Sequence, residues 1–145
     1  MRVDFYQLSR DPVEGVAPLI ARNSLKAGER LAVVSRDPEQ LRRIGDSLWS
    51  MAGDSFLANG MAGGAHDARQ PILLSSDMAT TNGARYLLIA DGEWRDGDPP
   101  FARTFFVFDR ATLQPARDCW RMLGQRDQID RRFWKRDGGK WVEGP

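Results

Sequence analysis

The sequence has 145 residues, the size of one ordinary domain, and a chain of this length can bury a core without disulfide or metal support. Hydrophobic residues make up 41% and charged residues 28%, a composition that excludes a disordered or collagen-like chain. The net charge is +1, and the excess of basic residues from residue 110 onward (nine against five acidic) predicts an acidic partner without the basic density that tight DNA binding needs.

The first part of the chain predicts alternating strands and helices. Residues 2–8 alternate as a strand does, and the unbroken apolar run at residues 31–34 predicts a strand covered on both faces. Between them, Asp11 is the predicted N-cap of a helix, with Pro12 at its first position and Glu14 completing a capping box. This order favours a parallel sheet with right-handed crossovers.

A second helix is predicted after the second strand. Asp37 is its predicted N-cap, and Gln40 stands where a capping box has its second partner. The apolar residues that share one face of this helix are Leu41, Ile44, Leu48 and Trp49. We therefore expect the helix to pack on the sheet through that face.

The rest of the chain completes an α/β domain. Residues 51–69 are rich in Gly, Ala and Asn and predict a long irregular connection with one short extended piece at residues 55–57. The elements predicted after it are strands at residues 71–75, 85–90 and 103–109, a loop at 91–100, a helix at about 112–123 and a hairpin that turns at 137–139. We expect a single domain over residues 1–145, with a mostly parallel sheet flanked by helices and a C-terminal hairpin.

A parallel sheet raises the question of a nucleotide site. The loops after the strands contain neither GxxxxGK[ST] nor GxGxxG, so there is no phosphate loop and we expect no cofactor. Cys119 is the only cysteine and His66 the only histidine, which excludes an internal disulfide and a Cys/His zinc site, and we expect no metal. No apolar run reaches the ~18 residues of a membrane span. The N-terminus lacks the apolar core of a signal peptide, so we expect a cytoplasmic location.

Two groups of aromatic residues are candidates for binding. The first comprises Trp49 at the end of the second helix, with Phe56, Leu57 and Met61 on the glycine-rich connection. Trp and Phe anchor many protein interfaces, and they also fill cores. The pattern alone favours core packing, with a partner-binding patch as the alternative.

The second group lies on the last predicted helix. Arg117, Trp120 and Arg121 stand at i, i+3 and i+4 and share one face, after a strand that ends with Phe106 and Phe108. Guanidinium groups beside an indole suit an acidic peptide with a hydrophobic last residue, because an arginine grips a terminal carboxylate through two parallel hydrogen bonds. A buried tryptophan flanked by solvated arginines is the simpler interpretation, and the pattern alone favours it.

A series of short motifs runs through nearly the whole chain in a recognisable order. They are FYQLSRD at residues 5–11, LAVVS at 31–35, DSLW at 46–49 with DSF at 54–56, QPILL at 70–74, VFD at 107–109, AR..WR at 116–121 and FW..D.G.W at 133–141. In this order and at this length, the chain resembles the chi subunit family of bacterial DNA polymerase III holoenzyme, whose members are accessory proteins of the clamp loader.

This resemblance implies an α/β fold similar to a mononucleotide-binding fold that lacks the phosphate loop, and it implies no catalysis. It also implies two partners. One is the acidic, phenylalanine-ending C-terminal tail of single-stranded DNA-binding protein, and the other is the psi subunit, which ties chi to the clamp loader. The expected function is that of a non-catalytic adaptor in DNA replication.

The resemblance also assigns roles by position. Arg117 looks like the residue that meets the terminal carboxylate of the tail, Trp120 like the aromatic lining of the phenylalanine pocket, and Arg121 like a base that contacts the tail's acids. Phe106 and Phe108 would form the other wall of that pocket. The residues that match the psi-facing patch of the family are Trp49, Phe56, Leu57 and Met61.

Two other functions stay open on the sequence alone: an enzyme on a degenerate nucleotide-binding fold, and direct nucleic-acid binding through the basic C-terminal third. The missing phosphate loop counts against the enzyme. The absence of dense Lys and Arg interleaved with exposed aromatic residues counts against tight direct binding of nucleic acid.

Overall fold

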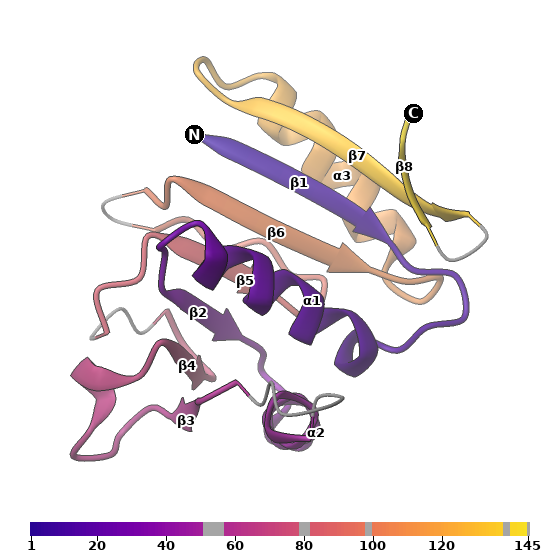
Figure 1. The fold of residues 1–145 in the computed structure, drawn as a ribbon. Helices are drawn as coiled ribbons and strands as arrows, with labels where there is room; N and C mark the ends of the chain where they lie inside the picture. Colours follow the sequence, from indigo (N-terminus) through magenta and orange to yellow (C-terminus); the bar gives the residue numbers. More distant parts are fainter. Residues whose placement is uncertain (51–56, 79–81, 98–99, 138–139, 145) are drawn as a thin grey trace.

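The computed structural model spans the whole chain, and the residues that it describes are 1–50, 57–78, 82–97, 100–137 and 140–144 (Figure 1). The helices and strands within them are β1 (Arg2–Gln7), α1 (Val13–Lys26), β2 (Leu31–Val34), α2 (Pro38–Trp49), β3 (Gly60–Met61), β4 (Ile72–Ser75), β5 (Tyr86–Ile89), β6 (Arg103–Phe108), α3 (Leu113–Gly124), β7 (Asp130–Asp137) and β8 (Lys140–Glu143). Each predicted helix and strand with described residues is present within a few residues of its expected bounds, apart from the short extended piece at 55–57.

Within the described residues, the strands form one sheet in the order β3-β4-β2-β5-β6-β1-β7-β8. Neighbouring strands run parallel, except that β7 and β8 are antiparallel and form the predicted C-terminal hairpin. The prediction of an α/β domain with a mostly parallel sheet is therefore confirmed. β1 lies between β6 and β7, so Phe5 stands opposite Phe106 on one side and Phe133 on the other.

Helices lie on both faces of this sheet (Figure 1). The buried residues of α1 and α2 pack against β2, β4 and Phe105 of β6 on one face. The buried residues of α3, which are Ala116, Cys119 and Leu123, pack with Phe5 on the opposite face. Successive side chains of a strand point to opposite faces, so β6 contributes to both cores.

The start of α1 differs from the prediction. The N-cap is Pro12 and not Asp11, and it makes no side-chain cap hydrogen bond. Asp11 instead pairs with Arg136 of β7, where Oδ2 lies 3.1 Å from Nε. Glu14 accepts a hydrogen bond from Nε of Arg43 in α2 at 2.8 Å. Both carboxylates of the predicted capping box are thus used in tertiary ion pairs.

The start of α2 matches its prediction in part. Asp37 is the N-cap, and its carboxylate accepts a hydrogen bond from the backbone N–H of Glu39 at 3.0 Å. Gln40 does not complete a capping box. Its amide donates to the carbonyl of Ala90 at 3.0 Å, and its side-chain oxygen accepts from the hydroxyl of Ser35. Gln40 therefore ties α2 to the ends of β2 and β5.

The connection between α2 and β4 is more regular than the predicted loop. β3 adds a short edge strand beside β4, and a 3₁₀-helix follows at Asp67–Arg69. The carboxylate of Asp67 accepts backbone N–H hydrogen bonds from Gly63 at 2.8 Å and Gly64 at 2.9 Å. Gly63 has φ of +103°, which favours glycine. Of the predicted extended piece at 55–57, residues 55 and 56 lie outside the described residues.

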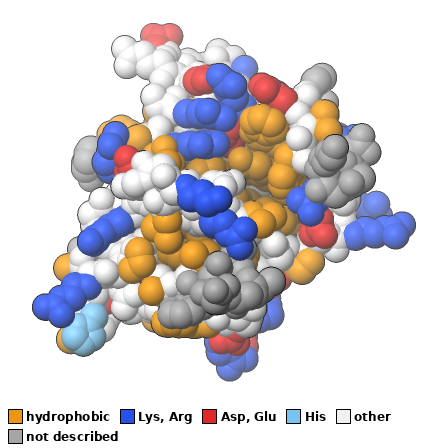
Figure 2. Space-filling model, in the orientation of Figure 1, with side chains coloured by type: hydrophobic (Ala, Val, Ile, Leu, Met, Phe, Trp, Pro, Cys, Tyr) orange, Lys and Arg blue, Asp and Glu red, His pale blue; other side chains and the backbone are white. Residues whose placement is uncertain are grey.

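On the face that α1 and α2 occupy, no described helix covers β1 and β7. The fully buried carboxylate of Asp4 lies there and accepts hydrogen bonds from Arg2 at 3.0 and 3.1 Å, from Arg103 at 2.7 Å and from Nε1 of Trp134 at 2.9 Å. Tyr6 stacks beside Trp134 with ring centroids 6.3 Å apart, and burial, followed by the charge of Asp4, raises the pKa of Tyr6 to about 12. Figure 2 shows basic side chains beside hydrophobic ones over this part of the sheet. A polar and aromatic network closes the face in place of a helix.

Candidate functional site

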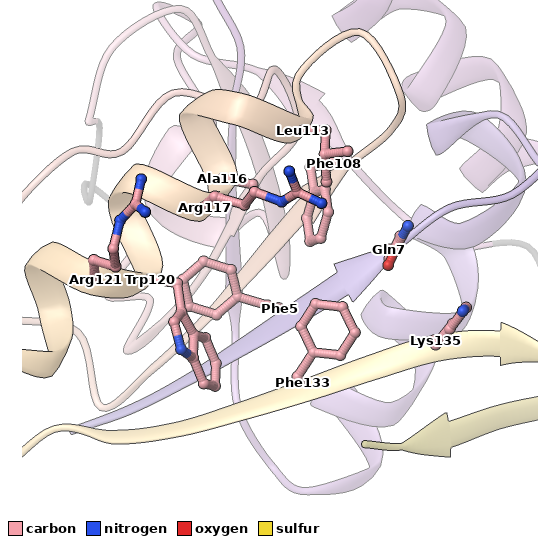
Figure 3. Close-up of a pocket in the computed structure, with 10 residues that line it drawn as sticks. All are labelled: Phe5, Gln7, Phe108, Leu113, Ala116, Arg117, Trp120, Arg121, Phe133 and Lys135. Carbon is pink, nitrogen blue, oxygen red and sulfur yellow. The ribbon is translucent and has the colours of Figure 1, made fainter. Parts of the chain in front are cut away.

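A cavity of about 570 Å³ lies between α3 and the strands β1, β6 and β7 (Figure 3). Its residues are Phe5, Gln7, Phe108, Leu113, Ala116, Arg117, Trp120, Arg121, Phe133 and Lys135. We call it the α3 cavity. Its volume falls within the roughly 300–1,000 Å³ that is usual for ligand sites.

The sheet provides the floor of the α3 cavity. Every second residue of a strand faces the same side, so Phe5 and Gln7 of β1 both face α3. The register places Phe133 and Lys135 of β7 beside them, and Phe108 of β6 beside Gln7. Three strands that are distant in sequence thus contribute neighbouring side chains.

The interior of the α3 cavity is aromatic, and the indole of Trp120 from α3 meets rings of the floor edge to face. The centroids of Phe5 and Trp120 lie 5.1 Å apart with an interplanar angle of 76°. Those of Trp120 and Phe133 lie 6.2 Å apart at 90°, and those of Phe108 and Phe133 lie 6.0 Å apart. Such geometry is favoured for aromatic pairs. The floor is therefore an ordered apolar surface that suits an aromatic or aliphatic side chain.

Helix α3 forms the opposite wall. The residues that it contributes recur at helical spacing and are Leu113, Ala116, Arg117, Trp120 and Arg121. Ala116 is buried, whereas Arg117 and Arg121 are exposed at the rim. The helix therefore presents an apolar surface inside the α3 cavity and positive charge at its mouth.

Arg131 of β7 fixes the position of Trp120. Its guanidinium carbon lies 4.2 Å from the centroid of the indole ring, and its Nη1 donates to the backbone carbonyl of Trp120 at 2.6 Å. A Cβ on Gly124 would lie 2.7 Å from the same Nη1. The guanidinium of Arg131 thus packs closely against the last residue of α3.

The charge at the α3 cavity is positive. None of the described residues that line it is Asp or Glu, whereas Arg117, Arg121 and Lys135 are all basic. Arg121 donates to Asp118 at 2.6 Å on the exposed side of the helix, and this hydrogen bond lowers the pKa of Asp118. The side chains of Arg117 and Lys135 make no hydrogen bond or ion pair with any described residue. Both cations are thus available to an anionic ligand.

The structure brings together most of the residues that the sequence singled out for tail binding. Arg117, Trp120, Arg121 and Phe108 all line the α3 cavity. Phe106 does not line it, because its side chain is fully buried, with its ring centroid 5.1 Å from that of Phe5. It packs beside Phe5 in the core on the α3 side of the sheet.

Sequence reasoning missed several residues of the α3 cavity. Phe5, Gln7, Phe133 and Lys135 were given no role, although Phe5 and Phe133 belong to the quoted motifs. The period-two alternation along β1 and β7 is the signal that identifies them, but it becomes useful only when the order of strands in the sheet is known.

The other predicted patch is exposed at two of its members. Trp49 and Met61 each keep 50% of their surface accessible, and Leu57 is partly buried against the core beside α1 and α2. The backbone N–H of Leu57 donates to the carbonyl of Leu48 at 2.8 Å, which brings this segment to the end of α2. Phe56 lies outside the described residues. We call Trp49, Leu57 and Met61 the Trp49 patch.

The exposure of Trp49 corrects two expectations from the sequence. Trp49 was predicted on the buried face of α2, and core packing was favoured for its group. Leu41, Ile44 and Leu48 are buried as predicted, but Trp49 is not. One residue turns a helix by about 100°, so the residue after Leu48 is directed away from the sheet.

The carboxyl ends of β2 and β5 form the place where a nucleotide would bind to such a sheet. There, Asp91 accepts hydrogen bonds from the backbone N–H of Arg36 at 2.9 Å and from Nη2 of Arg95 at 2.7 Å, and Glu93 pairs with Arg36. Burial acts to raise the pKa of Asp91, but the hydrogen bonds from Arg95 and Arg36 outweigh it and lower that pKa overall. The carboxylates at this edge are paired with Arg36 and Arg95, and they offset the positive charge that phosphate groups would need.

Cys119 lies on the buried face of α3. Burial raises the pKa of its thiol to about 12, so the side chain is a neutral thiol near pH 7.

In the described part of the chain, no group of three or more His, Cys, Asp or Glu side chains is arranged to hold a metal ion. Within those same residues, no helix combines the length and apolar character that a membrane span requires.

A comparison with protein families identifies the family of this chain. The model of the family described as "DNA polymerase III chi subunit, HolC" matches residues 1–129. The chain belongs to the chi subunit family. Membership places it in DNA replication, as a chi subunit of DNA polymerase III with partners in the replication machinery. No individual curated protein matches the chain. The family match ends just before β7, so Phe133 and Lys135 of the α3 cavity lie beyond the matched residues of this chi subunit.

Proposed function

We propose that this chi subunit is a non-catalytic adaptor that binds the acidic, phenylalanine-ending C-terminal tail of single-stranded DNA-binding protein in the α3 cavity. One observation carries the proposal: three basic residues border an aromatic floor that suits a phenyl ring, and no described lining residue is acidic. A peptide that combines negative charge with an apolar last residue has the complementary chemistry. The role would connect coated single-stranded DNA to the clamp loader.

Arg117 is the residue best suited to the terminal carboxylate. It stands between the aromatic floor and solvent and has no partner among the described residues. Its planar guanidinium donates two parallel hydrogen bonds to a carboxylate. A short peptide buries a small area, so we expect micromolar affinity, about −8 kcal/mol or weaker.

Replacing Arg117 by alanine is expected to weaken binding of a fluorescent tail peptide by about 1.5–3 kcal/mol, roughly 10- to 150-fold. Arg117→Lys should recover only part of this loss, because an ammonium group cannot form the two parallel bonds. Fluorescence anisotropy titrations of the free-acid peptide and of a peptide with an amidated C-terminus measure both effects. Amidation of the peptide should reproduce most of the loss seen in Arg117→Ala.

Two control variants separate a specific contact from general charge. Lys26→Ala removes one positive charge from α1, on the opposite face of the sheet, and should leave binding nearly unchanged. Arg121→Ala should cost less than Arg117→Ala and mainly reduce the salt dependence, because Arg121 is exposed and pairs with Asp118. Equal affinity for the amidated and free-acid peptides would show that the α3 cavity does not recognise a terminal carboxylate.

The Trp49 patch supports the second half of the adaptor role, binding to a psi subunit. It lies at the end of α2, whereas the α3 cavity lies on the other face of the sheet (Figure 1). The two candidate surfaces are therefore separate. Exposed Trp and Met side chains are typical of protein interfaces.

Trp49→Ala is expected to weaken the complex with psi by about 2 kcal/mol or more, roughly 30-fold, because a large aromatic anchor is removed. Isothermal titration with the psi protein of the same organism measures this change. The matched control is Leu48→Ala, one residue earlier and 1% exposed, which should instead lower the free energy of unfolding. A folded Trp49→Ala variant with unchanged affinity for psi would refute this use of the patch.

A further inference from the structure

Strand β7 supplies one side of the α3 cavity, although it follows the last residue matched by the family model. Phe133 contributes a ring to the floor, and Lys135 contributes a positive charge at the rim. The side chain of Lys135 is exposed and makes no hydrogen bond or ion pair with any described residue. Its side chain is therefore free to engage a ligand, and no contact among the described residues uses its charge.

The three cations of the α3 cavity are distributed unevenly along it. Lys135 stands beside Gln7, the last residue of β1, at the carboxyl edge of the sheet. Helical side chains lean toward the N-terminus of their helix, so Arg117 leans toward Leu113 and Phe108, which lie near the same edge. Figure 3 shows the guanidinium of Arg117 extending toward Phe108, with Lys135 across the cavity and Arg121 at the opposite end.

We propose that Lys135 is a second partner of the ligand's terminal carboxylate, facing Arg117 from the other side of the α3 cavity. This inference rests on the proposed function and adds a specificity residue to it. A carboxylate has about four acceptor positions, and the two bonds from a guanidinium leave the others unsatisfied. The three mobile N–H groups of a lysine on the opposite strand suit those remaining positions.

The placement fixes the direction of the peptide. With its carboxylate between Arg117 and Lys135 and its last side chain on the aromatic floor, the preceding residues extend along α3 toward Arg121. The acidic side chains then meet Arg121 and not Lys135. Lys135 therefore recognises the end of the chain, and Arg121 recognises the acidic residues before it.

The test is Lys135→Met, which keeps a flexible side chain and removes the charge. Lys135 is exposed, so the variant is expected to fold, and circular dichroism checks that it does. For the free-acid tail peptide we expect affinity to fall about fivefold, the size of a partly exposed charge pair. For a peptide whose acidic residues are changed to Asn, the same fivefold loss should remain. For the amidated peptide, Lys135→Met should have no effect.

Lys26→Met is the matched control, because it makes the same substitution on the opposite face and should leave all three peptides unaffected. An equal loss for the amidated and free-acid peptides would overturn the proposal, since Lys135 would then act on acidic side chains. Wild-type affinity of Lys135→Met for the free acid would overturn it as well. Failure of the proposed function gives a different result. In that case, Arg117→Ala would bind the free-acid peptide as the wild type does, and the wild type would bind the amidated and free-acid peptides equally.

Discussion

Asp4→Ala is expected to lower the free energy of unfolding by about 3 kcal/mol. Removing one partner of a buried ion pair costs about 3–5 kcal/mol, and the lower end applies because both arginines still reach solvent. The side chain of Asp4 is fully buried and accepts hydrogen bonds from Arg2, Arg103 and Nε1 of Trp134. It joins β1 to both of its neighbours in the sheet. Urea denaturation of the variant and of the wild-type protein measures the change.

A matched control for this prediction is Asp130→Ala. Asp130 lies on the adjacent strand β7 and pairs with Arg132 at 3.4 Å, but it is exposed, so its removal should change stability far less. If Asp4→Ala does not fold, Asp4→Asn gives the same comparison with a smaller loss, since the amide keeps one oxygen acceptor. A loss below about 1 kcal/mol in Asp4→Ala would show that the network does not stabilise β1 as proposed.

Local sequence patterns predicted most of the fold, and the starts of α1 and α2 show a feature that such patterns cannot predict. Asp11-Pro12 and Asp37-Pro38 look alike in the sequence, yet only Asp37 caps its helix. In the structure, Asp11 pairs instead with Arg136 of β7. β7 is distant in sequence, so a window around Asp11 contains no trace of this partner. Local sequence therefore could not distinguish the capping residue of α2 from the uncapped start of α1, because the partner of Asp11 is distant in sequence.

The candidate site likewise contains some residues that local sequence patterns predict and others that they do not. Arg117, Trp120 and Arg121 were predictable because helical spacing alone places them on one face. Phe5, Phe133 and Lys135 were not predictable, since their contribution depends on β1 lying between β6 and β7. Strand order is a non-local property, and period-two alternation identifies which residues share a face but not which strands are neighbours.

Phe106, which the sequence assigned to a wall of the cavity, is expected to behave as a core residue when it is changed. Phe106 is fully buried and packs on Phe5, Phe108 and Trp94, with ring centroids 5.1, 6.3 and 6.4 Å away. Phe106→Ala should therefore lower the free energy of unfolding by about 3–5 kcal/mol, the usual cost of deleting a buried phenyl ring.

Phe133→Ala is the comparison that separates the core from the α3 cavity. Phe133 is partly exposed and lines the cavity, so its removal should cost less stability and several-fold in affinity for the tail peptide. Phe106→Leu, which retains most of the volume, should fold and bind the peptide nearly as the wild type does. Urea denaturation gives the stabilities, and anisotropy titration corrected for the folded fraction gives the affinities. A folded Phe106→Leu variant that binds the peptide more weakly than Phe133→Ala would place Phe106 at the ligand after all.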